Sequence, residues 1–293
     1  MTQEQQYLDL LNNILYNGTT KKDRTGVGTN SLFGSILRFS LRDGKLPVLT
    51  TKKVFIRGVI EELLFFVRGE RDSKKLEAKG VNIWKGNTTR EFLDKRGLKY
   101  QKEGDIGPMY GVQWRDFNGE IESHHTGKGP GEGVDQLQNA FNLIKNDPTS
   151  RRIVVTAYNP AEAHMGCLEP CHMFFQFNVN PNGELDCLFY MRSIDCFLGL
   201  PFNIASYAVL THMMAKATGL KPGELVFSGG DTHLYLNHTE QAKEQISRTP
   251  FEFPTLNIKK DINSIEDMEK LEFEDFEIIG YQSHAAIKAD MAV

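Results

Sequence analysis

The chain has 293 residues, of which 40% are hydrophobic and 25% are charged, the composition of a globular protein able to bury a large core. Its formal net charge of −4 argues against a dedicated nucleic-acid binder, which would carry a strongly basic surface. A local basic pocket for one phosphorylated small molecule is compatible with this charge.

The beginning of the chain and its cysteines restrict the compartment. The stretch MTQEQQYLDLLNNIL lacks the basic-then-apolar order of a secretory signal, and no apolar run reaches the roughly 18 residues of a membrane span. A disulfide framework would be sparse in so long a chain, so reduced thiols in a cytoplasmic or nuclear compartment are expected. The four cysteines form no C-x-x-C pair and no metal-ligand spacing with nearby histidines; they are Cys167, Cys171, Cys187 and Cys196.

In the first half of the chain, apolar spacing predicts a helix over 3–16, a glycine-rich turn at DRTGVGTN and a strand over 31–41. Helical spacing returns over 55–67 and 135–146. The segment RRIVVTAY that follows is predicted to be a strand. Residues 118–133, rich in glycine and charge, are too few for a domain boundary and are expected to form a surface loop insertion.

The second half alternates strands with one long apolar helix. Strands are predicted over 173–179 and 184–192, and shorter ones near 224–227 and 273–281. The helix covers 203–218 and ends at a glycine followed shortly by proline. Because strands and helices mix without strict βαβ alternation, the fold class is predicted to be α+β: one domain over 1–293, with one mixed sheet covered by helices.

The segment Pro170-Cys171-His172 is a candidate nucleophile site. A cysteine attacks an electron-poor carbon only as the thiolate, which needs cationic or hydrogen-bonding help. His172 beside it and Arg192 one strand later are candidates for that help. A cysteine next to a strand is more typical of a structural residue, so this segment carries little weight alone.

Arg192 and Ser193 lie at the end of a predicted strand, where a planar cation and a hydroxyl suit a phosphate. Asn203 begins the apolar helix, so it is either an N-cap or a side chain whose donor and acceptor read a pyrimidine edge. His233 and Tyr235 lie two residues apart and share a face if their segment is extended. Further phosphate candidates are Arg24, Arg151 and Arg152, although a single arginine is more typical of a solvated surface.

In this order, these segments resemble the thymidylate synthase family over essentially the whole chain. The run 192–208 is the most specific of them. The matching segments are DRTGVGT, LTTKK, EELLFF, IGPMYGVQWR, RRIVV, PCHMFFQF, RSIDCFLGLPFNIASYA, GGDTHLYLNH and IKADMAV.

The resemblance implies an enzyme that converts dUMP to dTMP, with 5,10-methylenetetrahydrofolate as one-carbon and hydride donor and with no metal. Cys171 would attack C6 of the pyrimidine, and Asn203 would select uracil over cytosine. A polar network of Glu62, Tyr110 and His172 would move protons.

The resemblance also implies a homodimer formed through the sheet, without membrane or nucleic-acid partners. Within one subunit the phosphate would be bound by Arg24, Arg192 and Ser193, while Arg151 and Arg152 would reach across to the partner's phosphate. His233 and Tyr235 would bind the sugar 3′ hydroxyl. The folate would meet Asp195 through its pterin and Lys52 through its glutamate tail. The remaining folate residues implied are Ile83, Trp84, Leu168, Leu198, Gly199, Phe202 and, from the closing carboxyl terminus, Met291.

Six positions depart from the family pattern. Met191 replaces a Gln, Lys85 an acidic residue and Phe65 a Trp. Gly166-Cys167 replaces Met-Ala, and Glu169 brings a carboxylate close to the nucleophile, which it would oppose unless it points outward or is paired. Two alternatives stay open at this point: a dUMP or dCMP 5-hydroxymethylase of the same family, and a non-catalytic RNA-binding member.

Overall fold

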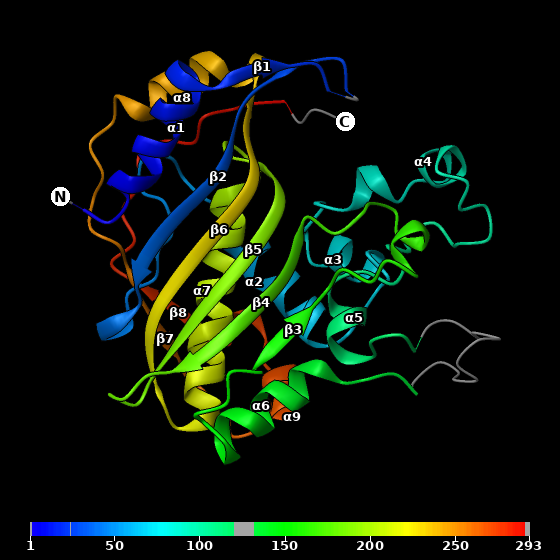
Figure 1. Cartoon of the computed structure of the whole chain (residues 1–293), viewed down its shortest axis with the longest axis vertical. Coiled ribbons are helices and arrows are strands. Elements are labelled where there is room, and N and C mark those ends of the chain that lie inside the picture. The colour runs from blue at the N-terminus through cyan, green and yellow to red at the C-terminus, as the bar shows by residue number, and fades with distance from the viewer. Residues whose placement is uncertain (1, 24, 120–131, 291–293) are drawn as a thin grey trace.

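A six-stranded sheet forms the centre of the molecule (Figure 1). The computed structural model describes residues 2–23, 25–119 and 132–290. The strand order is β1-β2-β6-β5-β4-β3; β5 and β6 run parallel and the other neighbours antiparallel, so the predicted mixed sheet is confirmed. Its strands are β1 (Thr19–Lys21), β2 (Thr29–Ser40), β3 (Val154–Thr156), β4 (His172–Val179), β5 (Glu184–Asp195) and β6 (Lys221–Tyr235).

A second, two-stranded antiparallel sheet pairs β7 (Thr255–Ile258) with β8 (Phe276–Ile279). The prediction of a single sheet is therefore wrong for the end of the chain. The predicted strand over 273–281 contains β8 but begins with a short 3-10 helix, η5 (Phe273–Asp275), closed by a capping box between Glu272 and Asp275.

Helices pack against the sheet and around its ends (Figure 1). The α-helices are α1 (Gln5–Asn17), α2 (Ile56–Val67), α3 (Lys74–Ala78), α4 (Arg90–Lys95), α5 (Gly111–Arg115), α6 (Gln136–Asn146), α7 (Gly199–Thr218), α8 (Thr239–Ile246) and α9 (Ile265–Glu269). Short 3-10 helices also occur at η1 (Arg42–Gly44), η2 (Lys85–Asn87), η3 (Ala163–Met165) and η4 (Leu236–His238). The three predicted helices over 3–16, 55–67 and 135–146 are confirmed as α1, α2 and α6.

Helix α7 is buried along almost its whole length and packs against β5 and β6. It ends where the sequence predicts, because Gly219 adopts a left-handed conformation with φ 78°. It begins four residues earlier than predicted, at Gly199. Asn203 therefore lies inside the helix, and its interpretation as an N-cap is wrong.

Two strands differ in length from their prediction. Strand β6 has 15 residues where only 224–227 was predicted, because pairing with β2 on one side and β5 on the other keeps its polar and glycine-rich second half extended. Strand β3 has three residues within the predicted 151–158, because it pairs only with β4 at the edge of the sheet. Its preceding arginines lie outside the ladder.

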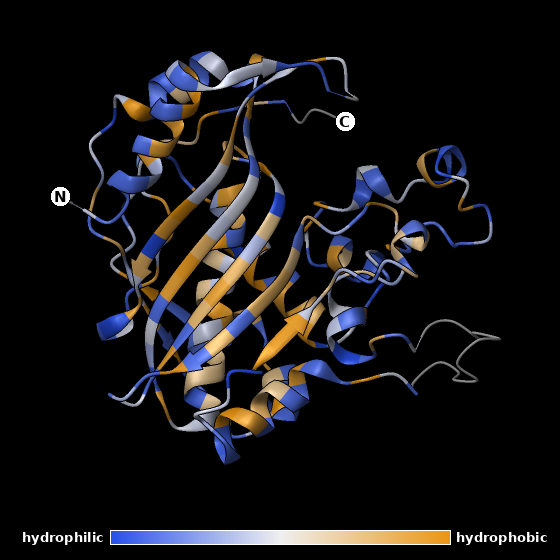
Figure 2. Ribbon diagram, viewed as in Figure 1, coloured by the Kyte–Doolittle hydropathy of each residue, from blue (hydrophilic) through white to orange (hydrophobic). Residues whose placement is uncertain are grey.

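One face of the sheet is packed and the other carries exposed apolar side chains. Figure 2 shows apolar and polar stretches along the strands of the sheet. A single cluster of buried apolar side chains runs from Tyr7 to Phe276 and includes residues of β2, β4, β5, β6 and α7. The predicted loop 118–133 starts from a bridge between Phe117 and Val134, and its residues 120–131 lie outside the described part of the chain.

Candidate active site

Cys171 differs from the other three cysteines in its exposure. It precedes β4 and is partly exposed, whereas Cys167, Cys187 and Cys196 are completely buried. Burial raises the pKa of Cys167 and of Cys187 to about 12 and that of Cys196 well above its ordinary value. All four thiols belong to the described residues, and Cys171 alone among them can meet a dissolved substrate.

Arg192 on β5 holds the loop that carries this thiol. Its Nε donates to the Pro170 carbonyl and one terminal nitrogen to the Glu169 carbonyl, each at 2.9 Å. Its backbone N–H donates to the Cys171 carbonyl at 2.9 Å. The Glu169 side chain is exposed, so the carboxylate lies in solvent. Arg192 therefore contacts the backbone around Cys171, and its action on the thiolate stays a prediction.

Behind the thiol lies an aromatic stack of Tyr110 and His172, which the ring of Tyr207 meets edge-on. The imidazole of His172 lies parallel to the Tyr110 ring, with 3.9 Å between ring centres, and its Nδ1 is 2.7 Å from the Tyr207 hydroxyl. The Tyr110 hydroxyl accepts the backbone N–H of Cys171 at 3.0 Å. Burial lowers the pKa of His172 to about 3, so this imidazole is neutral and cannot supply a positive charge to the thiolate. The predicted help from His172 is thereby restricted to hydrogen bonding.

Tyr110 is held in an unusual backbone conformation. It immediately precedes α5 with φ 38° and ψ −99°, a region that side chains other than glycine rarely occupy. Its ring is fixed between His172 and, at 5.1 Å, Phe66 of α2. Strain of this kind persists where the surroundings determine the conformation, and it is common at functional sites.

A carboxyl group that titrates near neutral pH lies beside this stack. Glu62 on α2 accepts the indole N–H of Trp84 at 2.8 Å. Burial raises the pKa of Glu62 to about 7, although the bond from Trp84 acts in the opposite direction. The Trp84 ring lies 5.9 Å from that of Tyr110. A carboxyl group with this pKa can both give and take a proton at neutral pH.

Asp195 at the end of β5 shapes the turn into α7. One carboxylate oxygen accepts the backbone N–H groups of Phe197 and Leu198 at 2.9 and 3.0 Å, which explains why the helix starts at Gly199. Lys52 approaches the same turn: its ammonium donates to the Phe197 carbonyl and lies 3.5 Å from the centre of the Phe197 ring. Burial lowers the pKa of Lys52 to about 7, against the attraction of Asp195.

Polar groups of β5 and β6 line up across the parallel ladder. Ser193 is opposite Asp231 and Asp195 is opposite His233. The predicted shared face is confirmed for His233 and Tyr235, whose rings meet edge to face at 5.2 Å. The imidazole Nδ1 of His233 lies 3.2 Å from a carboxylate oxygen of Asp231.

The remaining predicted residues surround this region at different depths. Arg151 and Arg152 are exposed before β3, at the edge of the sheet. Arg24 and Met291 lie outside the described residues. Trp84 is buried, and the other described apolar side chains predicted to contact the folate are partly buried and pack against the core; they are Ile83, Leu168, Leu198 and Phe202.

Sequence reasoning missed Tyr207, whose hydroxyl binds His172. Its position four residues after Asn203 puts both on one face of α7, a spacing that was available to find it. Two departures from the family pattern lie in different surroundings: Met191 is buried in the core on β5, and Lys85 is exposed, 3.9 Å from Glu77. Among the described residues, no cluster of three or more His, Cys, Asp or Glu side chains could hold a metal ion, and no helix could span a membrane.

Comparison with known proteins gives one consistent family. The family model described as thymidylate synthase matches residues 5–293. Thymidylate synthase of Homo sapiens is 50% identical over 99% of this chain and 91% of its own length. Thymidylate synthase 1/2 of Encephalitozoon cuniculi is 50% identical over 99% of this chain and 97% of its own.

Relatives with two activities in their names are also similar. Bifunctional dihydrofolate reductase-thymidylate synthase of Leishmania major is 52% identical over 99% of this chain and 55% of its own length. The chain thus spans about half the length of these bifunctional relatives.

Proposed function

The chain belongs to the thymidylate synthase family, and we propose that it catalyses the conversion of dUMP to dTMP with 5,10-methylenetetrahydrofolate, releasing dihydrofolate. The observation that carries this proposal is the half-exposed thiol of Cys171 beside the Arg192 guanidinium and the Tyr110 hydroxyl. A single domain over 1–293 with reduced thiols is suited to a reducing compartment such as the cytoplasm or nucleus.

The thiolate of Cys171 adds to C6 of the pyrimidine, which gives C5 the character of an enolate carbon. Arg192 favours the anionic sulfur through its positive charge, and its bonds to the two carbonyls before Cys171 fix where that sulfur lies. The exposed Glu169 carboxylate does not oppose this effect strongly, because solvent screens it.

Proton transfer falls to Glu62 with Tyr110 and His172. A carboxyl group with a pKa of about 7 is suited to protonate O4 while C5 is activated and to accept the C5 proton later. Tyr110 accepts a hydrogen bond from the Cys171 backbone, so its own hydroxyl hydrogen is directed elsewhere, toward the reacting nucleotide.

Substrate recognition uses the polar edge of β5 and β6. Ser193 and Arg192, together with Arg24, hold the phosphate, and His233 and Tyr235 bind the sugar 3′ hydroxyl. Asn203, partly exposed on α7, reads O4 and N3 of uracil through one donor and one acceptor.

The folate co-substrate supplies the methylene carbon and the hydride when it is bound. The partly buried apolar side chains around the site fit the flat pterin and benzoyl rings, and Trp84 and Gly199 border the same region. The second carboxylate oxygen of Asp195 is left for the pterin. Lys52 meets the glutamate tail only by leaving the Phe197 carbonyl, and the carboxyl-terminal residues through Met291 close the site against water.

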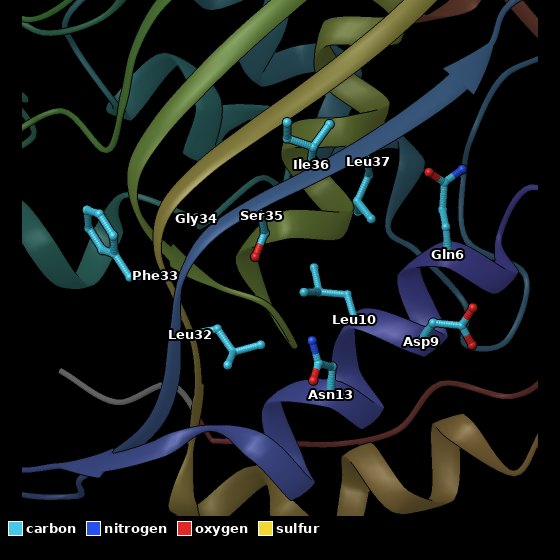
Figure 3. Close-up of a pocket in the computed structure, with 10 residues that line it drawn as sticks. All are labelled: Gln6, Asp9, Leu10, Asn13, Leu32, Phe33, Gly34, Ser35, Ile36 and Leu37. Atoms are coloured by element: carbon cyan, nitrogen blue, oxygen red, sulfur yellow. The ribbon is translucent and has the colours of Figure 1, made fainter.

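The active unit is a dimer formed through the sheet. Large apolar side chains of the sheet remain exposed, above all Phe33, which is 84% exposed, and Ile36, which is 71% exposed. A surface pocket of about 420 Å³ lies beside them, between α1 and β2, and is lined by Leu10, Leu32 and Leu37 among others (Figure 3). The exposed Arg151 and Arg152 then reach the phosphate of the partner subunit.

A product assay tests the proposal. The protein is incubated with dUMP and 5,10-methylenetetrahydrofolate, and the nucleotides are analysed by mass. dTMP with an equal amount of dihydrofolate is expected. 5-Hydroxymethyl-dUMP as the main product would replace methylation by hydroxymethylation. Absence of both products, together with no covalent adduct of Cys171 with 5-fluoro-dUMP and the folate in a folded sample, would favour a non-catalytic protein.

A further inference from the structure

The hydroxyl of Tyr207 is the polar end of a tightly packed ring. Tyr207 is 2% exposed on α7. Its ring lies parallel to Phe189 of β5 at 4.3 Å and meets Phe175 of β4 edge-on at 5.4 Å. Because the ring is held on two sides by the sheet, the direction of the hydroxyl is determined by packing and not by the bond it makes. That direction is toward His172 Nδ1, at 2.7 Å.

A neutral imidazole carries one hydrogen, on either of two nitrogens. If the Tyr207 hydroxyl donates to Nδ1 of His172, that hydrogen lies on Nε2. If Nδ1–H donates to the phenol oxygen instead, the phenol hydrogen needs another acceptor. Within the described part of the chain, the Tyr207 hydroxyl forms no second hydrogen bond. A buried hydroxyl hydrogen without an acceptor is unfavourable, so the first arrangement is preferred.

We propose that Tyr207 is a positioning residue that holds His172 as its Nε2–H tautomer, so that the imidazole presents a hydrogen-bond donor to the reacting nucleotide. The catalytic consequence rests on the proposed function, whereas the tautomer does not. Addition of the Cys171 thiolate to C6 moves negative charge onto the pyrimidine O4. A donor stabilises that charge, and a lone pair in the same place would oppose it.

The same bond orients the ring that supports Tyr110. The imidazole lies only 12° from parallel to the Tyr110 ring and nearly perpendicular, at 86°, to that of Tyr207. Burial keeps the imidazole neutral, since it lowers the pKa of His172 to about 3. Tyr207 therefore determines which neutral tautomer His172 adopts and does not determine whether the imidazole is protonated.

Imidazole nitrogen NMR of the protein without nucleotide tests the tautomer directly. The chain has 8 histidines, and His172 is assigned by the signals lost in His172→Gln. We expect wild-type His172 to show a protonated Nε2 and an unprotonated Nδ1. A wild-type spectrum with the hydrogen on Nδ1 would overturn the proposal, whether or not any variant folds.

Tyr207→Phe removes the oxygen and keeps the ring. We expect the His172 signals to shift toward the Nδ1–H form or an average of both, with kcat reduced on the order of tenfold and KM for dUMP changed less than about twofold. Tyr7→Phe is the matched control: it also loses one buried hydroxyl bond, to the Cys196 carbonyl at 2.8 Å, and should leave the His172 signals unchanged. Unaltered His172 signals in Tyr207→Phe, or the same shift in Tyr7→Phe, would refute the positioning role.

Discussion

The two sides of Cys171 differ in how much water reaches them. On one side, the aromatic stack, Glu62 and Trp84 form a buried region in which the pKa of His172 falls to about 3 and that of Glu62 rises to about 7. On the other side, Arg192 is half-exposed, and Arg151 and Arg152, which we propose serve the phosphate of the partner subunit, are exposed before β3.

The comparison separates two chemical tasks. Proton transfer needs groups whose pKa has moved toward the working pH, and burial achieves that. Phosphate binding needs cations that remain charged, and arginines in contact with water satisfy this without loss. Cys171 lies between the two regions, where Tyr110 on the buried side and Arg192 on the exposed side hold its backbone and its thiol stays accessible.

The largest effect is expected from removing the Cys171 thiol, which lies between the buried and the exposed region. Cys171→Ser should lower kcat by about 10⁴-fold or more, because a hydroxyl is rarely ionised near neutral pH. Steady-state dTMP formation measures it. Cys187→Ala, at a completely buried thiol, is the control and should retain activity. Comparable loss in both variants would mean that folding, and not the nucleophile, was affected.

The exposed side is tested by mixing subunits. Arg151→Ala/Arg152→Ala should lose about 10³-fold in kcat/KM for dUMP, since a dianion loses two charged partners. The double variant is then mixed with an equal amount of Cys171→Ser protein, and the mixture is unfolded and refolded. About a quarter of wild-type activity should return, because half of the randomly formed dimers contain one intact site out of two. Recovery to no more than the sum of the two variants would contradict the crossing of the arginines. Lys145→Ala, which removes an exposed cation of α6, is the control and should be active without a second variant.

The buried side is tested by the pH dependence of stability. The folded protein retains a proton on Glu62 up to about pH 7, whereas an unfolded chain loses it near pH 4.3, so this group lowers the free energy of unfolding as pH rises through that window. Glu62→Gln lacks the effect. Between about pH 4 and about pH 8, the free energy of unfolding of this variant should rise relative to that of wild type by at most about 3 kcal/mol. Urea denaturation measures both values. An equal gain in Glu91→Gln, at an exposed position, would show that burial is not the cause.

The smallest of the four effects concerns base selection on α7. Asn203→Asp should reduce the preference for dUMP over dCMP by about 10²-fold, because a protonated carboxyl group offers different partners to the pyrimidine edge. The ratio of kcat/KM for the two nucleotides measures it, with the exposed Asn142→Asp as control. An unchanged ratio would remove Asn203 from the recognition of the base.

Much of the fold was predictable because local spacing agrees with the tertiary structure. Helices α1, α2 and α6 have apolar stripes, and α7 ends at a glycine in the conformation that glycine favours. Strand β6 was underestimated because its extended second half, which contains Gly229 and Gly230, depends on two neighbouring strands far away in the sequence. The early start of α7 was missed because Asp195 ends a strand and caps the turn at the same time.

The candidate site was predictable as a set of residue types and not as an arrangement. Cys171, Arg192 and Glu62 were identified by their motifs, yet sequence proximity suggested that His172 could assist the thiolate with charge. Lys52 is predicted to face the folate tail, and the structure adds that its ammonium is bound to the Phe197 carbonyl. In both cases the neighbours that decide the outcome are distant in the chain.

By itself, the sequence determined the family and most helices and predicted the nucleophile, because these depend on residue identity and on spacing along the chain. Only the tertiary structure decided which of four cysteines is accessible, which carboxyl group titrates near neutral pH and which nitrogen of His172 meets Tyr207. The physical reason is that burial and hydrogen bonding act through space, and they are set by segments as distant as α2, β4 and α7.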